Sequence, residues 1–102
     1  MDENNLSEYR KRIDKIDAKI GKLVKERIEI VKDVGKLKAN FDISVRDEDR
    51  INEVYKNFVE NSGLLFDDAK KIYSPLIEHC IHIEKEIKTK NKNRKGKNKQ
   101  KL

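Results

Sequence analysis

The chain has 102 residues, of which 35% are apolar and 43% are charged, and its formal net charge is +6. This length allows one small domain, and the apolar fraction is too low for a deep core within a single subunit. A single cysteine, Cys80, excludes an internal disulfide and is typical of a reducing compartment, so we expect a cytoplasmic protein. The longest apolar runs are a few residues, so we expect no membrane-spanning segment.

The first predicted element is a helix over residues 6–40, a segment that contains no proline. Asn5 and Glu8 resemble a capping box at its start. Apolar residues then recur at steps of three and four, namely Leu6, Tyr9, Ile13, Ile16, Ile20, Leu23, Val24, Ile30, Val31, Val34 and Leu37. Such a helix is about 50 Å long, and a small domain cannot bury it along its whole length. We therefore expect its apolar stripe to pair with another chain.

Two cations lie on this stripe. Arg27 and Lys38 are 11 residues apart, so at 100° per residue they project from one face, together with Val31 and Val34. Burying a cation without a partner is costly. The pattern therefore predicts that both residues bind an anionic ligand.

A connector over residues 40–43 leads to a second predicted helix, from about Arg46 to Asn61. Ser44, three residues before Asp47, resembles a helix start. Gly63 is suited to a left-handed cap at the other end. The apolar stripe of this helix consists of Ile51, Val54, Tyr55, Phe58 and Val59.

The third predicted helix runs from about Asp67 to Lys88. Pro75 removes one backbone hydrogen bond within it, so the segment is either one kinked helix or a fresh helix that Ser74 caps. We favour the kinked helix. Its apolar positions are Ile72, Leu76, Ile77, Cys80, Ile81, Ile83 and Ile87. No segment predicts a strand, so we expect an all-α chain of three helices.

The positive charge belongs to the C-terminal end. Residues 88–102 contain eight Lys or Arg and no acid, whereas residues 1–87 contain 17 basic and 19 acidic residues. We therefore divide the chain into an N-terminal extension (1–5), a helical domain (6–88) and a disordered basic tail (89–102). Such a tail is usually solubilising, although it could bind nucleic acid weakly.

The charged residues on or beside the apolar stripes form one candidate set, namely Arg10, Arg27, Lys38, Asp47, Arg50 and Glu84. Arg10 and Arg27 are about 25 Å apart along one helix, so they cannot share a small pocket within one chain. Antiparallel pairing of two first helices would bring Arg10 of one chain to Arg27 and Lys38 of the other. Such a cluster suits a small dianion.

The sequence predicts no metal site, because His79, Cys80 and His82 match no standard metal-ligand spacing.

The order of these residues resembles the all-helical class of chorismate mutases over residues 6–88. The resemblance lies in Arg10-x-x-Ile13-Asp14-x-Ile16-Asp17, Glu26-Arg27, Val34-Gly35-x-x-Lys38 and Val45-Arg46-Asp47-x-Asp49-Arg50. It implies an intertwined homodimer of three-helix chains with two active sites. The implied reaction is the isomerisation of chorismate to prephenate on the route to phenylalanine and tyrosine. That rearrangement needs no metal or cofactor, because the protein only positions the substrate and stabilises developing charge.

The resemblance also implies roles for single residues. Arg10 from the partner chain and Arg27 bind substrate carboxylates, and Arg50 supports them. Lys38 donates to the ether oxygen and contacts the ring hydroxyl. The remaining implied contacts are those of Asp47, whose backbone lies at the hydroxyl, and Cys80, which stands in place of a serine near a carboxylate. With Glu84, Lys38 and Arg27 form the predicted catalytic set.

Two positions depart from the family pattern. Glu84 stands where many members have a glutamine donor, and a carboxyl group donates only when it is protonated. We therefore predict that activity falls as the pH rises. Ile51 stands where the family usually has a glutamate for the substrate hydroxyl, which predicts weaker catalysis or binding.

Alternative functions are an isochorismate-pyruvate lyase on the same fold, or a non-catalytic helical interaction module with a nucleic-acid-binding tail. Any feedback regulation would require a partner enzyme.

Overall fold

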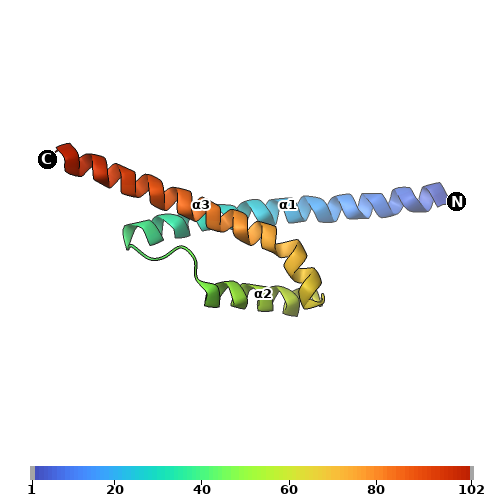
Figure 1. The fold of residues 1–102 in the computed structure, drawn as a ribbon. Coiled ribbons are helices and arrows are strands. Elements are labelled where there is room, and N and C mark those ends of the chain that lie inside the picture. The colour runs from blue at the N-terminus through green and yellow to red at the C-terminus, as the bar shows by residue number, and fades with distance from the viewer. Residues whose placement is uncertain (1, 102) are drawn as a thin grey trace. The chain divides into compact units, whose positions relative to one another are not determined.

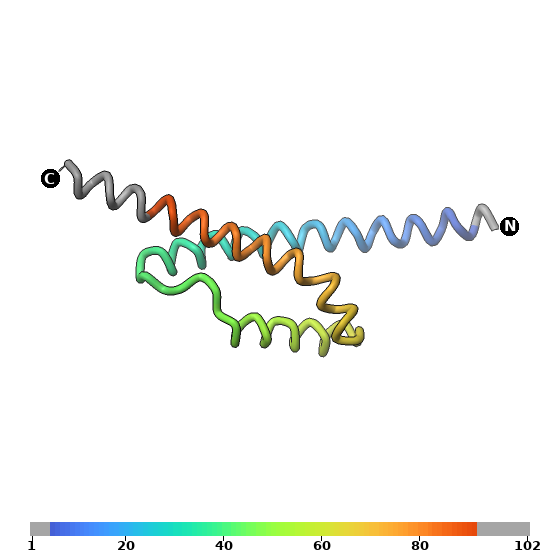
Figure 2. The backbone as a smooth tube through the Cα atoms, viewed as in Figure 1, coloured from blue at the N-terminus to red at the C-terminus, as the bar shows by residue number. Residues whose placement is uncertain are grey.

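The computed structural model describes the backbone of residues 2–101 and the side chains of residues 5–91 (Figures 1 and 2). Three helices follow in order: α1 (Asp2–Asn40), α2 (Glu48–Ser62) and α3 (Phe66–Lys101). No strand occurs in residues 2–101, so the predicted all-α fold with three helices is confirmed. The chain forms two compact units, residues 1–30 and residues 31–102.

The first unit is the N-terminal part of α1. Its apolar residues alternate at steps of three and four, the 3.5-residue spacing of a coiled-coil seam. Seven residues of this seam are about half exposed or more, namely Leu6, Tyr9, Ile13, Ile16, Ile20, Leu23 and Ile30. Helix α1 begins at Asp2, so residues 2–5, predicted as an extension, belong to it. Among the described side chains this unit has no core of its own, and the predicted pairing of its apolar face with another chain stays a prediction.

The second unit has a small core between α2 and α3. Four buried residues form it, namely Val45, Tyr55, Ile77 and Ile81, with Ile51, Val54 and Tyr73 packed against them. Figure 1 shows that α3 turns back after the short loop that follows α2, so that the two helices pack on each other. Ring contacts add to the packing, because Phe58 stacks on Tyr73 with 4.2 Å between ring centroids. This core fixes the helices that carry the polar groups described below.

Both ends of α2 are capped. The side chain of Asp47 accepts a hydrogen bond from the backbone N–H of Arg50 at 3.1 Å, which makes Asp47 the N-cap. The prediction that Ser44 starts this helix is wrong, because its hydroxyl lies 3.5 Å from the Arg46 carbonyl. At the other end, Gly63 has φ 71° and donates to Val59 at 2.9 Å. The predicted left-handed cap is confirmed.

Helix α3 is one continuous helix with Pro75 inside it, so the single-helix alternative is confirmed. Its direction changes within its first turns (Figure 2), as expected where a proline removes a backbone hydrogen bond. It continues to Lys101, beyond the predicted end near Lys88, so the backbone of the predicted disordered tail is helical as far as that residue. The side chains of residues 92–102 lie outside the described residues.

The end of α1 is a Schellman motif that starts the connector, residues 41–47. The N–H of Ile43 donates to the carbonyl of Lys38 at 2.8 Å, and the N–H of Phe41 donates to Leu37 at 3.1 Å. Asp42 lies between them with φ 53°, in the left-handed region that glycine occupies most easily. A residue with a Cβ atom is therefore held here at some cost in free energy.

Asp42→Gly is expected to raise the free energy of unfolding by about 0.5–1 kcal/mol, because glycine adopts the left-handed conformation without a Cβ clash. The Asp42 side chain is 98% exposed, and its 3.7 Å pairing with Lys88 adds little. The control is Asp33→Gly inside α1, which should lower the unfolding free energy by about 1 kcal/mol. Urea unfolding at one protein concentration measures both, and destabilisation by Asp42→Gly would contradict the assignment.

Candidate functional site

The ammonium group of Lys38 is the centre of a polar site in the second unit. Its Nζ atom donates to the carbonyl oxygen of Val45 at 2.8 Å and lies 2.9 Å from Oε1 of Glu84. The three residues come from α1, the connector and α3, so packing of the second unit brings them together. An ammonium carries three protons and the hydrogen bond to Val45 uses one of them, so the group can donate to a further partner beside the ion pair with Glu84.

Glu84 is the only buried charged residue among the described side chains, with 7% of its surface exposed. The side chain of Lys38 is 20% exposed, so the ion pair is largely removed from water. Oε1 of Glu84 nevertheless accepts no hydrogen bond of normal geometry from any described residue. The pair is therefore close in distance but poorly aligned. A buried oxygen of this kind marks a place where a ligand group can complete the bonding.

Gly35 permits the close approach of α1 and α3 at this site. A Cβ atom on Gly35 would lie 3.2 Å from the Cα atom of Glu84 and 3.2 Å from Cδ1 of Ile87. Because one of these neighbours is backbone, a larger residue would push the two helices apart. Gly35 precedes Lys38 by one helical turn, so the absence of its side chain sets how near the ammonium stands to the Glu84 carboxylate.

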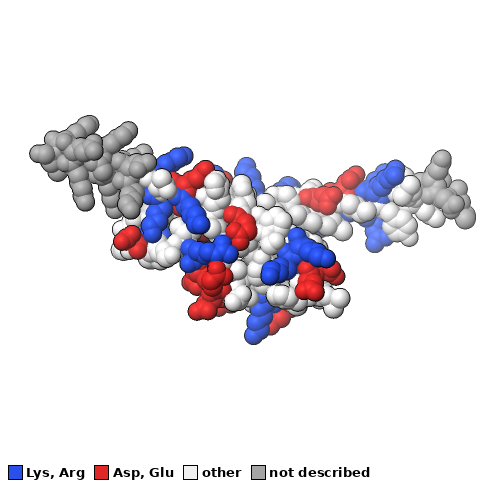
Figure 3. Space-filling view, in the orientation of Figure 1, with Lys and Arg blue, Asp and Glu red and all other residues white. Residues whose placement is uncertain are grey.

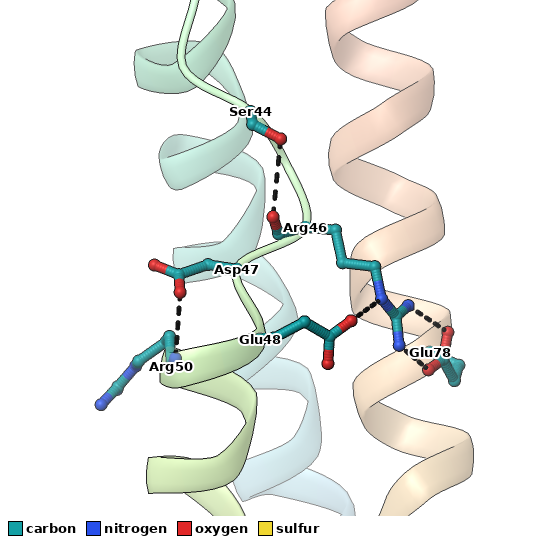
Figure 4. Close-up of polar contacts among 6 residues, drawn as sticks. All are labelled: Ser44, Arg46, Asp47, Glu48, Arg50 and Glu78. Carbon is teal, nitrogen blue, oxygen red and sulfur yellow. Dashed lines mark hydrogen bonds and ion pairs between the residues drawn. The ribbon is translucent and has the colours of Figure 1, made fainter.

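Arg46 ties the connector to α3 (Figure 4). Its guanidinium donates through Nη1 and Nη2 to the two carboxylate oxygens of Glu78, each at 3.2 Å, and Nε donates to Glu48 at 2.6 Å. The hydrogen bond to Glu78, followed by that to Glu48, raises the pKa of Arg46 above its usual range. The guanidinium therefore stays charged, and the bidentate geometry fixes the connector next to Val45.

Asp47 and Arg50 lie at the start of α2 (Figure 4). The Asp47 carboxylate caps the helix, so its side chain is occupied by the backbone N–H of Arg50. The Arg50 guanidinium is exposed and pairs with Glu53 one turn further along. Within the described residues Arg50 pairs with Glu53 and contacts neither Lys38 nor Glu84, so its predicted supporting role stays a prediction.

Cys80 and Ile51 face the interior. Cys80 is buried and forms no disulfide, and it lies one helical turn before Glu84, so the two project from the same side of α3. Ile51 packs against the apolar core of the second unit. The position where the family usually has a glutamate is therefore part of the core in this chain, which explains why an apolar residue is stable there.

Arg10 and Arg27 belong to the first unit. Arg10 is exposed and lies along a shallow open groove of α1 with Leu6, Ser7, Lys11 and Asp14. Arg27 is half-buried and already has an interaction partner. Arg27 continues the 3.5-residue alternation between Leu23 and Ile30, so a helix that packed on this seam would cover it.

Other kinds of site find little support in the described part of the chain. Among residues 5–91, no group of three His, Cys, Asp or Glu side chains is arranged to hold a metal ion. Over the same residues, none of the helices has a stretch long and apolar enough to cross a bilayer. On the face seen in Figure 3, basic and acidic side chains are mixed over α2 and α3. This mixture gives no extended basic surface on that face.

Comparison with known proteins decides the family. The chorismate mutase type II family matches residues 9–85, which is most of the chain and includes every residue of the polar site. The chain belongs to the chorismate mutase type II family. Its all-α architecture, its predicted family and its assignment as an isomerase are thereby confirmed.

Two relatives support this membership. The chain is 38% identical over 101 residues to the chorismate mutase of Methanocaldococcus jannaschii, a match that covers 88% of this chain and 96% of the relative. It is 32% identical over 89 residues to a bifunctional chorismate mutase/prephenate dehydratase of Aquifex aeolicus, covering 81% of this chain and 25% of that protein. No solved structure gives a significant match.

Of the predicted site residues in this family member, the second unit brings Lys38 and Glu84 into contact and places Cys80 one turn away. Sequence reasoning did not find the Val45 carbonyl as a partner of Lys38, because a backbone acceptor leaves no trace in residue type. It also missed the contact between Arg46 and Glu78, which are 32 residues apart. Only packing can reveal such a pair.

Proposed function

We propose that the chain converts chorismate to prephenate as a homodimer in the cytoplasm, on the route to phenylalanine and tyrosine. The observation that carries the proposal is the partly shielded Lys38 ammonium, held between Val45 and Glu84 in a chain of this family. The rearrangement breaks a C–O bond and forms a C–C bond within one molecule. It needs a donor at the ether oxygen, where negative charge develops, and Lys38 supplies a fixed one.

The substrate is a dianion, so its carboxylates require cations in addition to Lys38. Arg27 lies on the apolar seam of α1. Arg10 lies next to the same seam, about 25 Å from Arg27 along the helix axis. We propose that two α1 seams pack antiparallel, so that Arg10 of the partner subunit completes the site that contains Arg27 and Lys38. The exposed apolar stripe of the first unit supports this arrangement, because a lone helix gains nothing from such a stripe.

Three further roles complete the proposed site. Asp47 would approach the ring hydroxyl through its backbone, because its carboxylate caps α2. Cys80 would donate weakly near a carboxylate. Arg50 would have to leave Glu53 in order to support the carboxylates, and its exposed position allows that movement. A pathway enzyme that docks on the dimer is a further proposed partner.

Glu84 has a second part in the proposal. In the absence of a ligand it faces the Lys38 ammonium, but it can donate to the ether oxygen only as the neutral acid.

We expect the activity of the wild type to fall as the pH rises, because the donor form of Glu84 is lost on that side. Glu84→Gln keeps a neutral donor of the same size at every pH, so its profile of kcat/KM should be flat on the basic side. The measurement is prephenate formation between about pH 5 and 9, a range that brackets ordinary side-chain titrations near neutrality. Glu60→Gln, which alters an exposed carboxylate of α2, is the matched control. An unchanged basic limb in Glu84→Gln would refute the donor role.

The direct test of function is a prephenate-formation assay on the purified full chain, followed by size analysis in solution. Chorismate should be consumed and prephenate formed, while isochorismate should give no pyruvate. Pyruvate release from isochorismate without prephenate formation would favour the lyase. Nucleic-acid binding that persists when neither reaction occurs would favour the interaction module, and its affinity should then fall steeply with salt.

A further inference from the structure

Lys88 makes a contact that the reaction as described does not use. Its Nζ atom donates to the carbonyl oxygen of Ile43 at 2.8 Å and lies 3.7 Å from a carboxylate oxygen of Asp42. The side chain is 28% exposed, so the hydrogen bond is partly shielded from water. Lys88 follows the last residue of the family match, residue 85, and therefore stands outside the shared pattern.

Two lysines from different helices hold alternate carbonyls of the connector. Lys88 of α3 binds the carbonyl of Ile43, and Lys38 of α1 binds the carbonyl of Val45 two residues later. The N–H of Ile43 is fixed as well, because it donates to the backbone carbonyl of Lys38 at 2.8 Å. The N–H of Ile43 is thus bound to Lys38 of α1, and its carbonyl is bound to Lys88 of α3.

Arg46 secures the same segment further along, through its bidentate contact with Glu78 of α3. The connector is therefore attached to α3 on both sides of Val45. Because Val45 is buried and its carbonyl accepts from Lys38, the position of this short segment sets the direction of the Lys38 ammonium. Without the attachment at Ile43, only the Schellman motif would hold the first half of the connector.

We propose that Lys88 is a positioning residue for the reaction, which acts through Ile43 and the Val45 carbonyl on the Lys38 ammonium. This inference rests on the proposed function. Lys88 does not touch the substrate. Its effect is to keep a remaining proton of the ammonium aimed at the point where charge develops, and a donor aimed in advance needs no reorganisation during the reaction. A loosened donor affects the transition state more than the ground state, so the loss falls on kcat rather than on KM.

The experiment compares Lys88→Met, Lys88→Arg and the control Lys85→Met, which alters an exposed lysine of the same helix. Hydrogen exchange of the Ile43 amide is measured first, because this readout does not depend on the reaction. Lys88→Met should exchange about fivefold faster than the wild type, as expected for one lost hydrogen bond. Lys88→Arg, which retains a donor, should restore most of the protection, and Lys85→Met should leave it unchanged.

Steady-state kinetics on the same proteins then test the positioning role. Lys88→Met should lower kcat by about three- to tenfold at a KM within about twofold of the wild type, and Lys88→Arg should recover most of the loss. Normal kcat in Lys88→Met, or a loss that matches the unfolded fraction alone, would overturn the inference. If the wild type forms no prephenate, the proposed function fails, while the exchange measurement still decides whether Lys88 holds the connector.

Discussion

Lys38→Met is expected to reduce kcat for prephenate formation by about 10²–10³-fold, the usual cost of removing one preorganised donor from a shielded site. Methionine keeps the length and apolar stem of the side chain but cannot donate to the ether oxygen. The Val45 carbonyl also loses its partner, so the connector loosens. The measurement is the steady-state rate with chorismate, and Lys36→Met, at an exposed position of the same helix, is the matched control.

The same substitution should also lower the stability of the second unit. It leaves the Glu84 carboxylate buried without its cation, and breaking such a pair costs up to about 3 kcal/mol. The double variant Lys38→Met/Glu84→Gln removes the stranded charge, so it should regain most of the unfolding free energy while staying inactive. If Lys38→Met keeps even a tenth of the wild-type kcat, Lys38 is not the donor.

Two inactive variants are expected to restore activity when their chains form mixed dimers. One variant is Arg10→Ala and the other is Lys38→Met. In a mixed dimer, the chain with Arg10→Ala still has Lys38, and its partner subunit still supplies Arg10, so one of the two sites is complete. Random pairing makes about half of the dimers mixed, so co-expressed chains should show about a quarter of the wild-type activity.

A negative control separates shared sites from simple mixing effects. Arg27→Ala and Lys38→Met change residues that are proposed to serve the same site from the same chain. Mixed dimers of these two variants contain no complete site, so no activity should return. Recovery in this control, or none in the pair with Arg10→Ala, would contradict the site composition. A monomer in solution would contradict it as well, since α1 would then keep its apolar seam in water.

The helices of this chain could be predicted because their signals are local. The alternation of apolar residues along 6–40 depends only on helical periodicity, and Gly63 marks the end of α2 because glycine occupies the left-handed region at no steric cost. The first residue of α2 is harder to predict from the sequence, because Ser44 and Asp47 are both suitable N-cap residue types. The fold of the connector selected Asp47, whose carboxylate faces the N–H of Arg50.

Local periodicity is enough to predict the seam of α1, the three helices and the shared face of Arg27 and Lys38, because helical geometry alone relates residues a few turns apart. The contacts of Lys38, by contrast, can be known only from the folded chain. Its partner Glu84 lies 46 positions along the chain, and the Val45 carbonyl is a backbone group that every residue type carries. The absence of a side chain at Gly35 is what allows α1 and α3 to approach closely beside Glu84. Contacts of this kind depend on how helices pack, and no local pattern encodes the distance between two of them.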